Sequence, residues 1–190
     1  MTIAMIGAAL CVFAGNLWLI GHAANLTPFW DEWDAGVASL LKPYAEGTLD
    51  WKSLFQPFNE HIIFFPRLVI LSVYIASGYY DVIAQMILNA LLFSMFTVAI
   101  SAGLSRRLDA AARYYVLASA VLINLIPFSW QNTLMAIGGT EFLFTAAFSA
   151  ASLALIAGAR AFSVRWWLGF ALTARCGSRV FSLRLGRGRW

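Results

Sequence analysis

Long apolar segments dominate the chain, and short polar stretches separate them. About 20 apolar residues in helical form span the hydrocarbon core of a bilayer, so apolar runs near this length predict membrane-crossing helices. The strongest candidates are residues 3–24, 82–104, 114–128 and 142–159. Residues 62–77 are apolar but hold a proline and an arginine, and residues 166–172 are too short to cross unaided.

This pattern predicts an all-α fold, a polytopic transmembrane helical bundle over residues 1–174. Residues 175–190 abandon the apolar pattern for closely spaced arginines, and we expect them to form a basic, unstructured tail. The one long polar stretch, residues 25–60, is the first loop of the bundle and is predicted to contain amphipathic juxtamembrane helices.

An amphipathic helix is predicted in the first half of this loop. Thr27 is a suitable N-cap and Pro28 a suitable first helical residue, and acidic residues follow in the first turn. At about 100° per residue, one face collects Trp30, Trp33, Val37, Leu40 and Leu41. The opposite face collects Asp31, Ala35, Ser39 and Lys42. We expect this helix to lie on the membrane surface until Pro43 ends it, with a shorter helix near residues 51–55.

The composition agrees with a membrane environment. The chain is 61% hydrophobic and 12% charged, whereas an average soluble domain carries about 25% charged residues. Its net charge of +4 arises in the tail, which holds five of the 13 basic residues. Such a tail can contact anionic lipid, but a solvated cytoplasmic end explains it more simply, and we expect no nucleic-acid partner.

The topology of the predicted spans conflicts with their flanking charges. If residues 62–77 cross and the N-terminus is cytoplasmic, the later arginines face outside, against the positive-inside rule. Three explanations stay open: the N-terminus is outside, residues 62–77 do not cross, or packing against other helices overrides the rule. Length favours the second, because these 16 residues would span about 24 Å of a core that is about 30 Å thick.

Two polar clusters in the first loop are candidates for chemistry. They consist of Asp31, Glu32 and Asp34, and of Asn59, Glu60, His61 and Arg67. A carboxylate can act as general base toward a hydroxyl, and two carboxylates can hold a divalent cation. An arginine can hold a phosphate by charge-assisted hydrogen bonds. These groups together suit transfer from a lipid-linked phosphate to an acceptor, although acids in a first helical turn can serve only to cap the helix.

The stretch from DEWD (residues 31–34) to NEHIIFFPRL (residues 59–68) follows one apolar helix and leads into another. In this it resembles the first extracytoplasmic loop of GT-C membrane glycosyltransferases, such as protein mannosyltransferases and aminoarabinose transferases. It looks still more similar to uncharacterised bacterial multipass proteins related to that class. The resemblance covers roughly residues 1–160. It implies transfer of a sugar, with inversion, from a polyprenyl-phosphate donor to an acceptor outside the bacterial inner membrane.

The resemblance also implies roles for the acidic residues. Asp31 or Asp34 would accept the proton of the acceptor hydroxyl, and Glu32 would be its partner or a metal ligand. We favour Asp31 because it follows the first span most closely and faces away from the lipid side of the predicted helix. A divalent cation is a candidate cofactor, and membrane lipid and the lipid-linked sugar are the expected partners.

The second cluster would bind the donor. His61 and Arg67 would approach its phosphate, with Asn59 and Glu60 beside them. An ordinary interfacial histidine and an arginine extended toward lipid headgroups explain the same residues without a ligand.

A second polar loop, at 129–139, contains Trp130, Gln131 and Asn132, close to Glu141. An aromatic ring beside neutral hydrogen-bonding groups suits a sugar, and it equally suits the aromatic belt at a membrane interface.

The chain is short for a GT-C enzyme, and its arginine-rich ending interrupts an apolar stretch. We therefore hypothesise that it is a truncated or frame-shifted version of a longer protein. The alternative function is that of a non-enzymatic integral membrane protein, such as a transporter fragment or an assembly subunit. The scarcity of polar residues inside the predicted spans weighs against transport. A soluble enzyme is disfavoured because the sequence has no Gly-rich phosphate loop, catalytic triad pattern or Cys/His ligand set.

Overall fold

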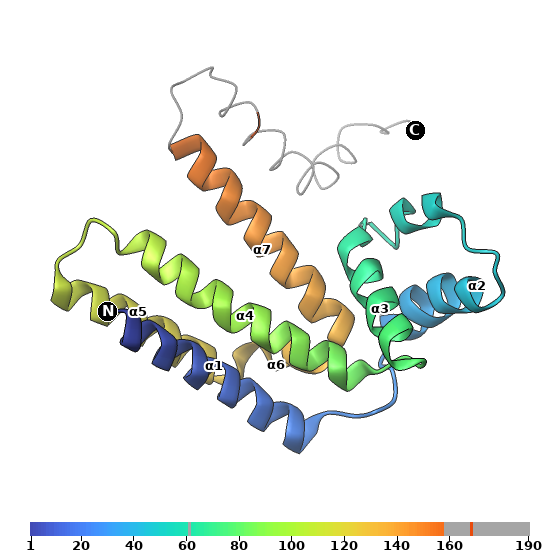
Figure 1. Ribbon diagram of the computed structural model, residues 1–190, viewed down its shortest axis with the longest axis horizontal. Coiled ribbons are helices and arrows are strands. Elements are labelled where there is room, and N and C mark those ends of the chain that lie inside the picture. Colours follow the sequence, from blue (N-terminus) through green and yellow to red (C-terminus); the bar gives the residue numbers. More distant parts are fainter. Residues whose placement is uncertain (61, 158–167, 169–190) are drawn as a thin grey trace, which may run out of the picture. The chain divides into compact units, whose positions relative to one another are not determined.

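Residues 1–60, 62–157 and 168 are described by the structure, a computed structural model (Figure 1). The elements in these residues are helical, which confirms the predicted all-α class. The α-helices are α1 (Thr2–Ala23), α2 (Lys42–Ala45), α3 (Phe64–Ser77), α4 (Val82–Leu104), α5 (Ala110–Leu125), α6 (Trp130–Leu134) and α7 (Ala136–Ala157). Between them lie a π-helix, η1 (Glu32–Leu41), and the 3₁₀ turns η2 (Trp51–Phe55) and η3 (Pro127–Ser129).

The chain divides into two compact units, Met1–Leu143 and Phe144–Trp190. The described part of the second unit is the remainder of α7 together with Leu168. There the Ser152 hydroxyl donates a hydrogen bond to the carbonyl of Phe148, at 2.7 Å. The predicted tail, residues 175–190, lies outside the described residues. Both cavities discussed below lie in the first unit.

Three helices among the described residues are long and apolar enough to cross a membrane, which indicates a membrane protein. They are α1, α4 and the part of α7 at Ala136–Ile156. The predicted starts of the later helices were wrong, because α5 begins at Ala110 and α7 at Ala136. For α5 the reason is a cap: the Asp109 carboxylate accepts a hydrogen bond from the backbone N–H of Ala112 at 2.9 Å.

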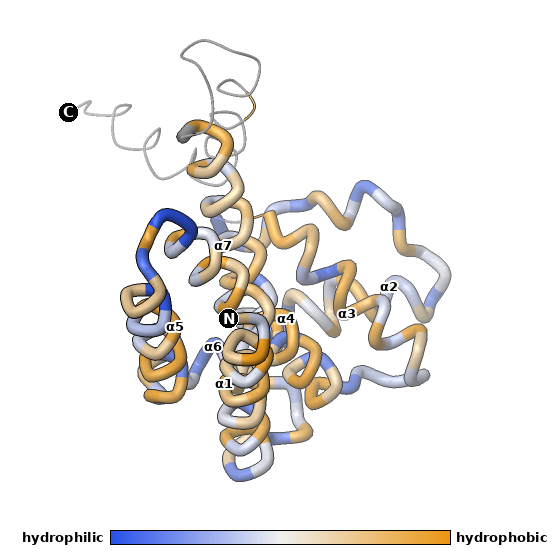
Figure 2. The backbone as a smooth tube through the Cα atoms, turned by 60° about the vertical axis from the view of Figure 1, so that its left-hand side comes forward, coloured by the Kyte–Doolittle hydropathy of each residue, from blue (hydrophilic) through white to orange (hydrophobic). Residues whose placement is uncertain are grey.

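Most of the buried residues of α4 are polar, beside the apolar Val82, Met86 and Ala90, which differs from the pattern of a helix in a soluble protein. Its buried polar residues are Gln85, Asn89, Ser94, Thr97 and Ser101. Large apolar side chains of the same helix are exposed, among them Ile87, Leu91 and Met95. In a bilayer this arrangement turns apolar side chains to lipid and leaves polar ones to bond inside the protein. Figure 2 shows apolar positions along most of α1, α4 and α5.

Helices α1 and α4 lie side by side and run in opposite directions (Figure 1). Ile20, near the end of α1, packs with Val82 and Met86 at the start of α4. Residues 24–81 therefore leave and rejoin this helix pair at the same end. Within that segment α3 has only 14 residues, a length of about 21 Å. This geometry favours the explanation in which residues 62–77 do not cross the membrane.

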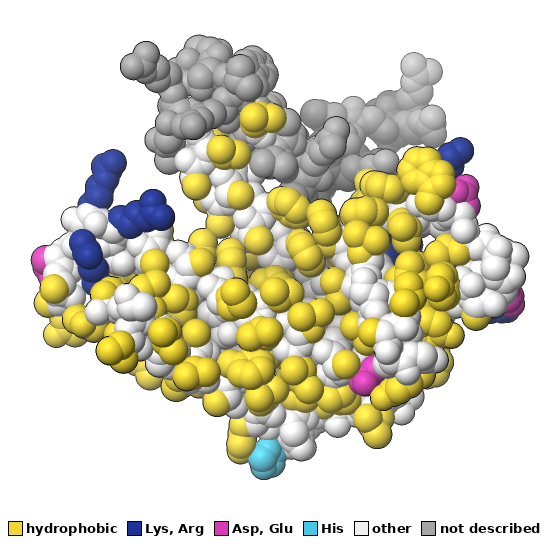
Figure 3. Space-filling view, viewed as in Figure 1, with side chains coloured by type: hydrophobic (Ala, Val, Ile, Leu, Met, Phe, Trp, Pro, Cys, Tyr) yellow, Lys and Arg dark blue, Asp and Glu magenta, His cyan; other side chains and the backbone are white. Residues whose placement is uncertain are grey.

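Basic side chains gather at the end of α4 that lies away from the first loop, over the turn between α4 and α5 (Figure 3). Arg106 and Arg107 are exposed in that turn, and Arg113 follows in the first turn of α5. The first loop and this basic turn thus lie at opposite ends of α4. Such a separation of charge agrees with the positive-inside rule if the basic end is cytoplasmic.

The predicted amphipathic helix exists, but it starts later and is wound more loosely than expected. It is the π-helix η1, which begins at Glu32 rather than at Pro28 and in which the N–H of Lys42 bonds to the carbonyl of Val37, five residues earlier. The wider turn makes the α-helical projection wrong, so Ala35, assigned to the polar face, is fully buried.

The sequence predicted that Pro43 ends the helix, and this was wrong. Pro43 lies in the first turn of α2, which continues directly from η1. In a first turn the N–H that proline lacks would have no helical partner in any case. The shorter helix expected near residues 51–55 is present as η2.

The first loop has a small hydrophobic core of its own. Ala35, Leu40 and Leu41 of η1 pack against Ile70 of α3, and Ile137 in the first turn of α7 joins them. The loop is therefore an ordered cap over one end of the helices, fixed to the start of α7.

Candidate functional site

A cleft of about 330 Å³ forms where the chain leaving α1 meets the short helix α6. Its polar and indole side chains come from both loops: Asn25, Thr27, Trp30, Trp130, Gln131 and Asn132. The volume lies at the lower end of the range for small-molecule sites, which is about 300 to 1,000 Å³. The structure thus joins the second-loop residues that suit a sugar to the start of the acidic loop.

The two tryptophans of this cleft offer exposed aromatic surface. Trp30 is 73% exposed and Trp130 is 48% exposed. Trp30 has a positive φ of 53°, a left-handed conformation that is strained for a bulky side chain and recurs at ligand sites. Among the described residues, the lining of this cleft includes no charged side chain. It therefore suits a neutral group with both apolar faces and hydroxyls, and it offers a phosphate no cation.

The predicted base, Asp31, follows Trp30 directly and is half-buried, whereas Asp34 is exposed. Neither carboxylate lines the cleft. Asp31 is the N-cap residue of η1, but its side chain makes no capping hydrogen bond. Asp31 therefore does not cap η1 by a hydrogen bond, and its only shown link to the cleft is that it follows Trp30 in the sequence.

Glu32 differs from its neighbours, because its side chain is fully buried. Its carboxylate accepts hydrogen bonds from the backbone N–H of Phe29 at 2.7 Å and of Ile137 at 3.3 Å. Ile137 lies in the first turn of α7, where N–H groups lack helical partners and the helix dipole favours negative charge. Burial nevertheless dominates and raises the pKa of Glu32. Glu32 therefore fastens the first loop to α7, and the implied role as metal ligand has no support in this geometry.

Tyr80 lies close to this group. Burial, and after it the charge of Glu32, raise the pKa of the Tyr80 phenol well above its usual range. The phenol oxygen is buried without a hydrogen-bond partner among the described residues. A Cβ on Gly36 would lie 3.5 Å from that oxygen, so η1 approaches the ring closely there. The packing between η1 and the Tyr80 ring is therefore close.

Arg67, predicted to bind a donor phosphate, is 3% exposed and bonds to the backbone instead. One terminal nitrogen, NH1, donates to the carbonyls of Ser53 and Leu54 at 3.0 and 3.2 Å, and also to that of Gln56. Burial lowers the pKa of this guanidinium. Arg67 therefore holds the η2 segment against α3, which is a structural task that the sequence did not reveal.

The other members of the second cluster are not drawn into a site. Asn59 and Glu60 are both exposed, and Asn59 has a positive φ of 51°, which asparagine tolerates better than most residues. His61 lies outside the described residues. No group of three or more His, Cys, Asp or Glu side chains in the described part of the chain could hold a metal ion.

The sequence missed a network of amide and hydroxyl side chains between α4 and α7. The Gln85 amide donates to the Thr140 hydroxyl at 3.0 Å, and that hydroxyl lies 2.9 Å from the amide oxygen of Asn89. The Asn89 amide also donates to the carbonyl of Ala136, at 2.8 Å. Asn89 was visible as a polar residue inside an apolar span, but its partner 51 residues away was not.

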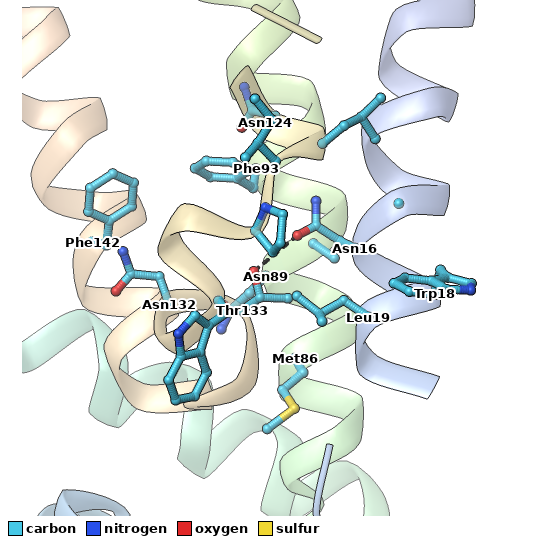
Figure 4. A pocket seen from close by; sticks show the side chains of 17 residues that line it. Asn16, Trp18, Leu19, Met86, Asn89, Phe93, Asn124, Asn132, Thr133 and Phe142 are labelled. Carbon is cyan, nitrogen blue, oxygen red and sulfur yellow. Dashed lines mark hydrogen bonds between the residues drawn. The ribbon is translucent and has the colours of Figure 1, made fainter. Parts of the chain in front are cut away.

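A second, smaller cavity of about 90 Å³ lies beside this network, between α1, α4, α5 and α6 (Figure 4). Asn132 and Trp130 line both cavities. Helix α6 therefore forms the partition between them.

Comparisons of the chain with protein-family models, with characterised proteins and with solved structures gave no match.

Proposed function

We propose that the chain is a membrane-embedded glycosyltransferase of the GT-C kind. It would transfer a sugar from a polyprenyl-phosphate donor to an acceptor on the extracytoplasmic face. The observation that supports this most is the cleft that joins Trp30 and Trp130 to neutral amide side chains. Asp31 follows Trp30 directly in the sequence, and its carboxylate makes no capping hydrogen bond to η1. Indole rings pack on the apolar face of a sugar, and amides bond to its hydroxyls.

In this proposal Asp31 is the general base, and the cleft holds the sugar or the acceptor rather than the phosphate. The acceptor oxygen attacks the anomeric carbon, the bond from that carbon to the phosphate oxygen breaks, and the acceptor proton passes to the Asp31 carboxylate. Glu32 and Arg67 have no part in the reaction, because both are buried and bonded to backbone groups.

The proposal is tested in membranes from cells that express the chain and from cells that do not. The cells are grown with tritiated monosaccharides, and label is followed from the acid-labile lipid-phosphate fraction into acid-stable products. Expression should create a labelled product, and Asp31→Asn should reduce its rate by about 100-fold or more, as expected for loss of a general base. Glu46→Gln, which changes an exposed acid at the end of α2, is the matched control and should leave the rate unchanged.

A non-enzymatic role is the second candidate. It is favoured by the structural tasks of Glu32 and Arg67, which leave fewer charged groups for catalysis. Absence of any labelled product, with the chain correctly inserted, would support this candidate against the transferase.

A further inference from the structure

Four asparagines, each from a different helix, surround the smaller cavity. They are Asn16 of α1, Asn89 of α4, Asn124 of α5 and Asn132 of α6 (Figure 4). In the part of the chain that the structure describes, no charged side chain lines this cavity. Four amides around one space between largely apolar helices are costly in a membrane unless they form hydrogen bonds.

Two of these amides are used within the protein. Asn16 donates to the carbonyl of Val12 at 2.9 Å and accepts from the Thr133 hydroxyl at 3.1 Å, a bond drawn as a dashed line in Figure 4. Asn89 bonds to α7 as described above. These two side chains are buried, with exposed fractions of only 9% and 6%, and they are held by hydrogen bonds within the protein.

The other two amides keep free capacity. Asn124 donates to the carbonyl of Ala120 at 2.7 Å, but its amide oxygen has no partner among the described residues. The side chain of Asn132 has no hydrogen-bond partner in the same part of the chain. The cavity therefore presents an unused acceptor and an unused amide, which together match a hydroxyl group.

The rim of the cavity is apolar and open. Trp18, Leu125 and Phe142 line it and are 63%, 41% and 43% exposed. Trp18 belongs to α1, one of the helices long enough to cross a membrane. The cavity thus opens on a surface that lipid would cover, with apolar groups outside and amides inside. This order of groups fits an amphiphile whose polar end is neutral.

The volume of the cavity limits the size of the polar group that a bound amphiphile can place in it. The volume of about 90 Å³ is smaller than the cavity of about 150 Å³ that accommodates a benzene ring in an engineered core. A hexose ring is therefore excluded, whereas a single hydroxymethyl group fits. We propose that this cavity binds the hydroxyl end of a neutral lipid alcohol, with the chains of the lipid passing over the apolar rim. The site does not depend on the transferase activity proposed above.

Binding is measured on the full chain in detergent by native mass spectrometry. The probes are dioctanoylglycerol and trioctanoylglycerol, which differ in a free hydroxyl, and geranylgeraniol with its methyl ether. We expect each alcohol to bind at one site, at least about 5-fold more tightly than its blocked partner, because a hydroxyl bond contributes about 1 kcal/mol. The alcohol that binds more tightly shows whether the natural ligand is a glycerol lipid or an isoprenoid alcohol.

The variants Asn124→Leu and Asn132→Leu should each remove most of this preference for the free hydroxyl. Gln56→Leu, which changes an exposed amide outside both cavities, should keep it. If one variant fails to fold, the other still tests the site. Equal binding of alcohol and blocked lipid, an unchanged preference in both variants, or no saturable binding would overturn the proposal and leave a cavity that holds only water.

Discussion

Replacement of Glu32 tests whether the first loop is fastened to α7 by this carboxylate. In Glu32→Ala the backbone N–H of Ile137 loses its acceptor in a buried place, and that of Phe29 loses its acceptor in a partly buried one. Each unsatisfied buried donor costs about 1 to 3 kcal/mol, and the lost burial of the side chain adds to this. Removal of a buried charge offsets part of the cost, so we expect a net loss of about 3 kcal/mol in the free energy of unfolding.

Glu32→Gln keeps one acceptor oxygen, so one of the two backbone N–H groups still loses its partner, and the variant should lose about 1 to 2 kcal/mol. The pH dependence separates the two charge states. Because the pKa of Glu32 is raised in the folded protein, the folded state holds the proton more tightly than the unfolded state. The wild type should therefore lose stability as the pH rises from about 4.5 through the folded pKa, and the Gln variant should lack this slope.

The assay is unfolding by SDS in mixed micelles, followed by tryptophan fluorescence, with hydrogen exchange of the Ile137 amide as a local readout. Asp34→Ala is the matched control, since this exposed acid lies on the same helix, and it should change stability by less than about 0.5 kcal/mol. The reasoning is refuted if Glu32→Ala matches the control, or if the Ile137 amide stays equally protected.

Three further changes test other contacts. Arg67→Met leaves the carbonyls that bind the guanidinium without a donor, which should cost about 2 to 4 kcal/mol and expose η2 to limited proteolysis; unchanged cleavage would contradict this. Gly139→Ala would bring a Cβ within 2.2 Å of the backbone oxygen of Asn132, so its free energy of unfolding in the SDS titration should fall by at least about 2 kcal/mol. Gly7→Ala, with no atom near the added Cβ, should change it by less than about 1 kcal/mol. Tyr80→Phe removes a buried hydroxyl that has no partner and should be neutral or stabilising by up to about 1 kcal/mol in the same titration; a clear loss of stability would reveal a bonded hydroxyl.

The apolar helices could be predicted because each one carries its own signal. α1 and α4 are recognisable from composition alone, and their bounds agree with the predicted ranges to within a residue. The start of α7 was missed because Gly138, Gly139 and Thr140 resemble a loop. Gly139 is instead needed inside the helix, where the backbone of α6 comes too close for a Cβ. That requirement belongs to the contact between two helices and leaves no local pattern.

The face of η1 could not be predicted for a different reason. A projection assumes the turn of an α-helix, and the same residues wound as a π-helix present Ala35 and Glu32 to the interior. The choice between these windings follows from the fit of the loop against α3 and α7, which supply the buried partners Ile70 and Ile137.

The sequence alone determined that this protein is helical and built for a membrane, because the exterior of each span must match lipid residue by residue. It also drew attention to Glu32 and Arg67, but not to their structural tasks. The carboxylate of Glu32 bonds to a backbone group 105 residues away, and the guanidinium of Arg67 to carbonyls 11 to 14 residues away. Only the tertiary structure decided that these two charged side chains hold the loop together, because burial and hydrogen bonding depend on segments that meet only when the chain is folded.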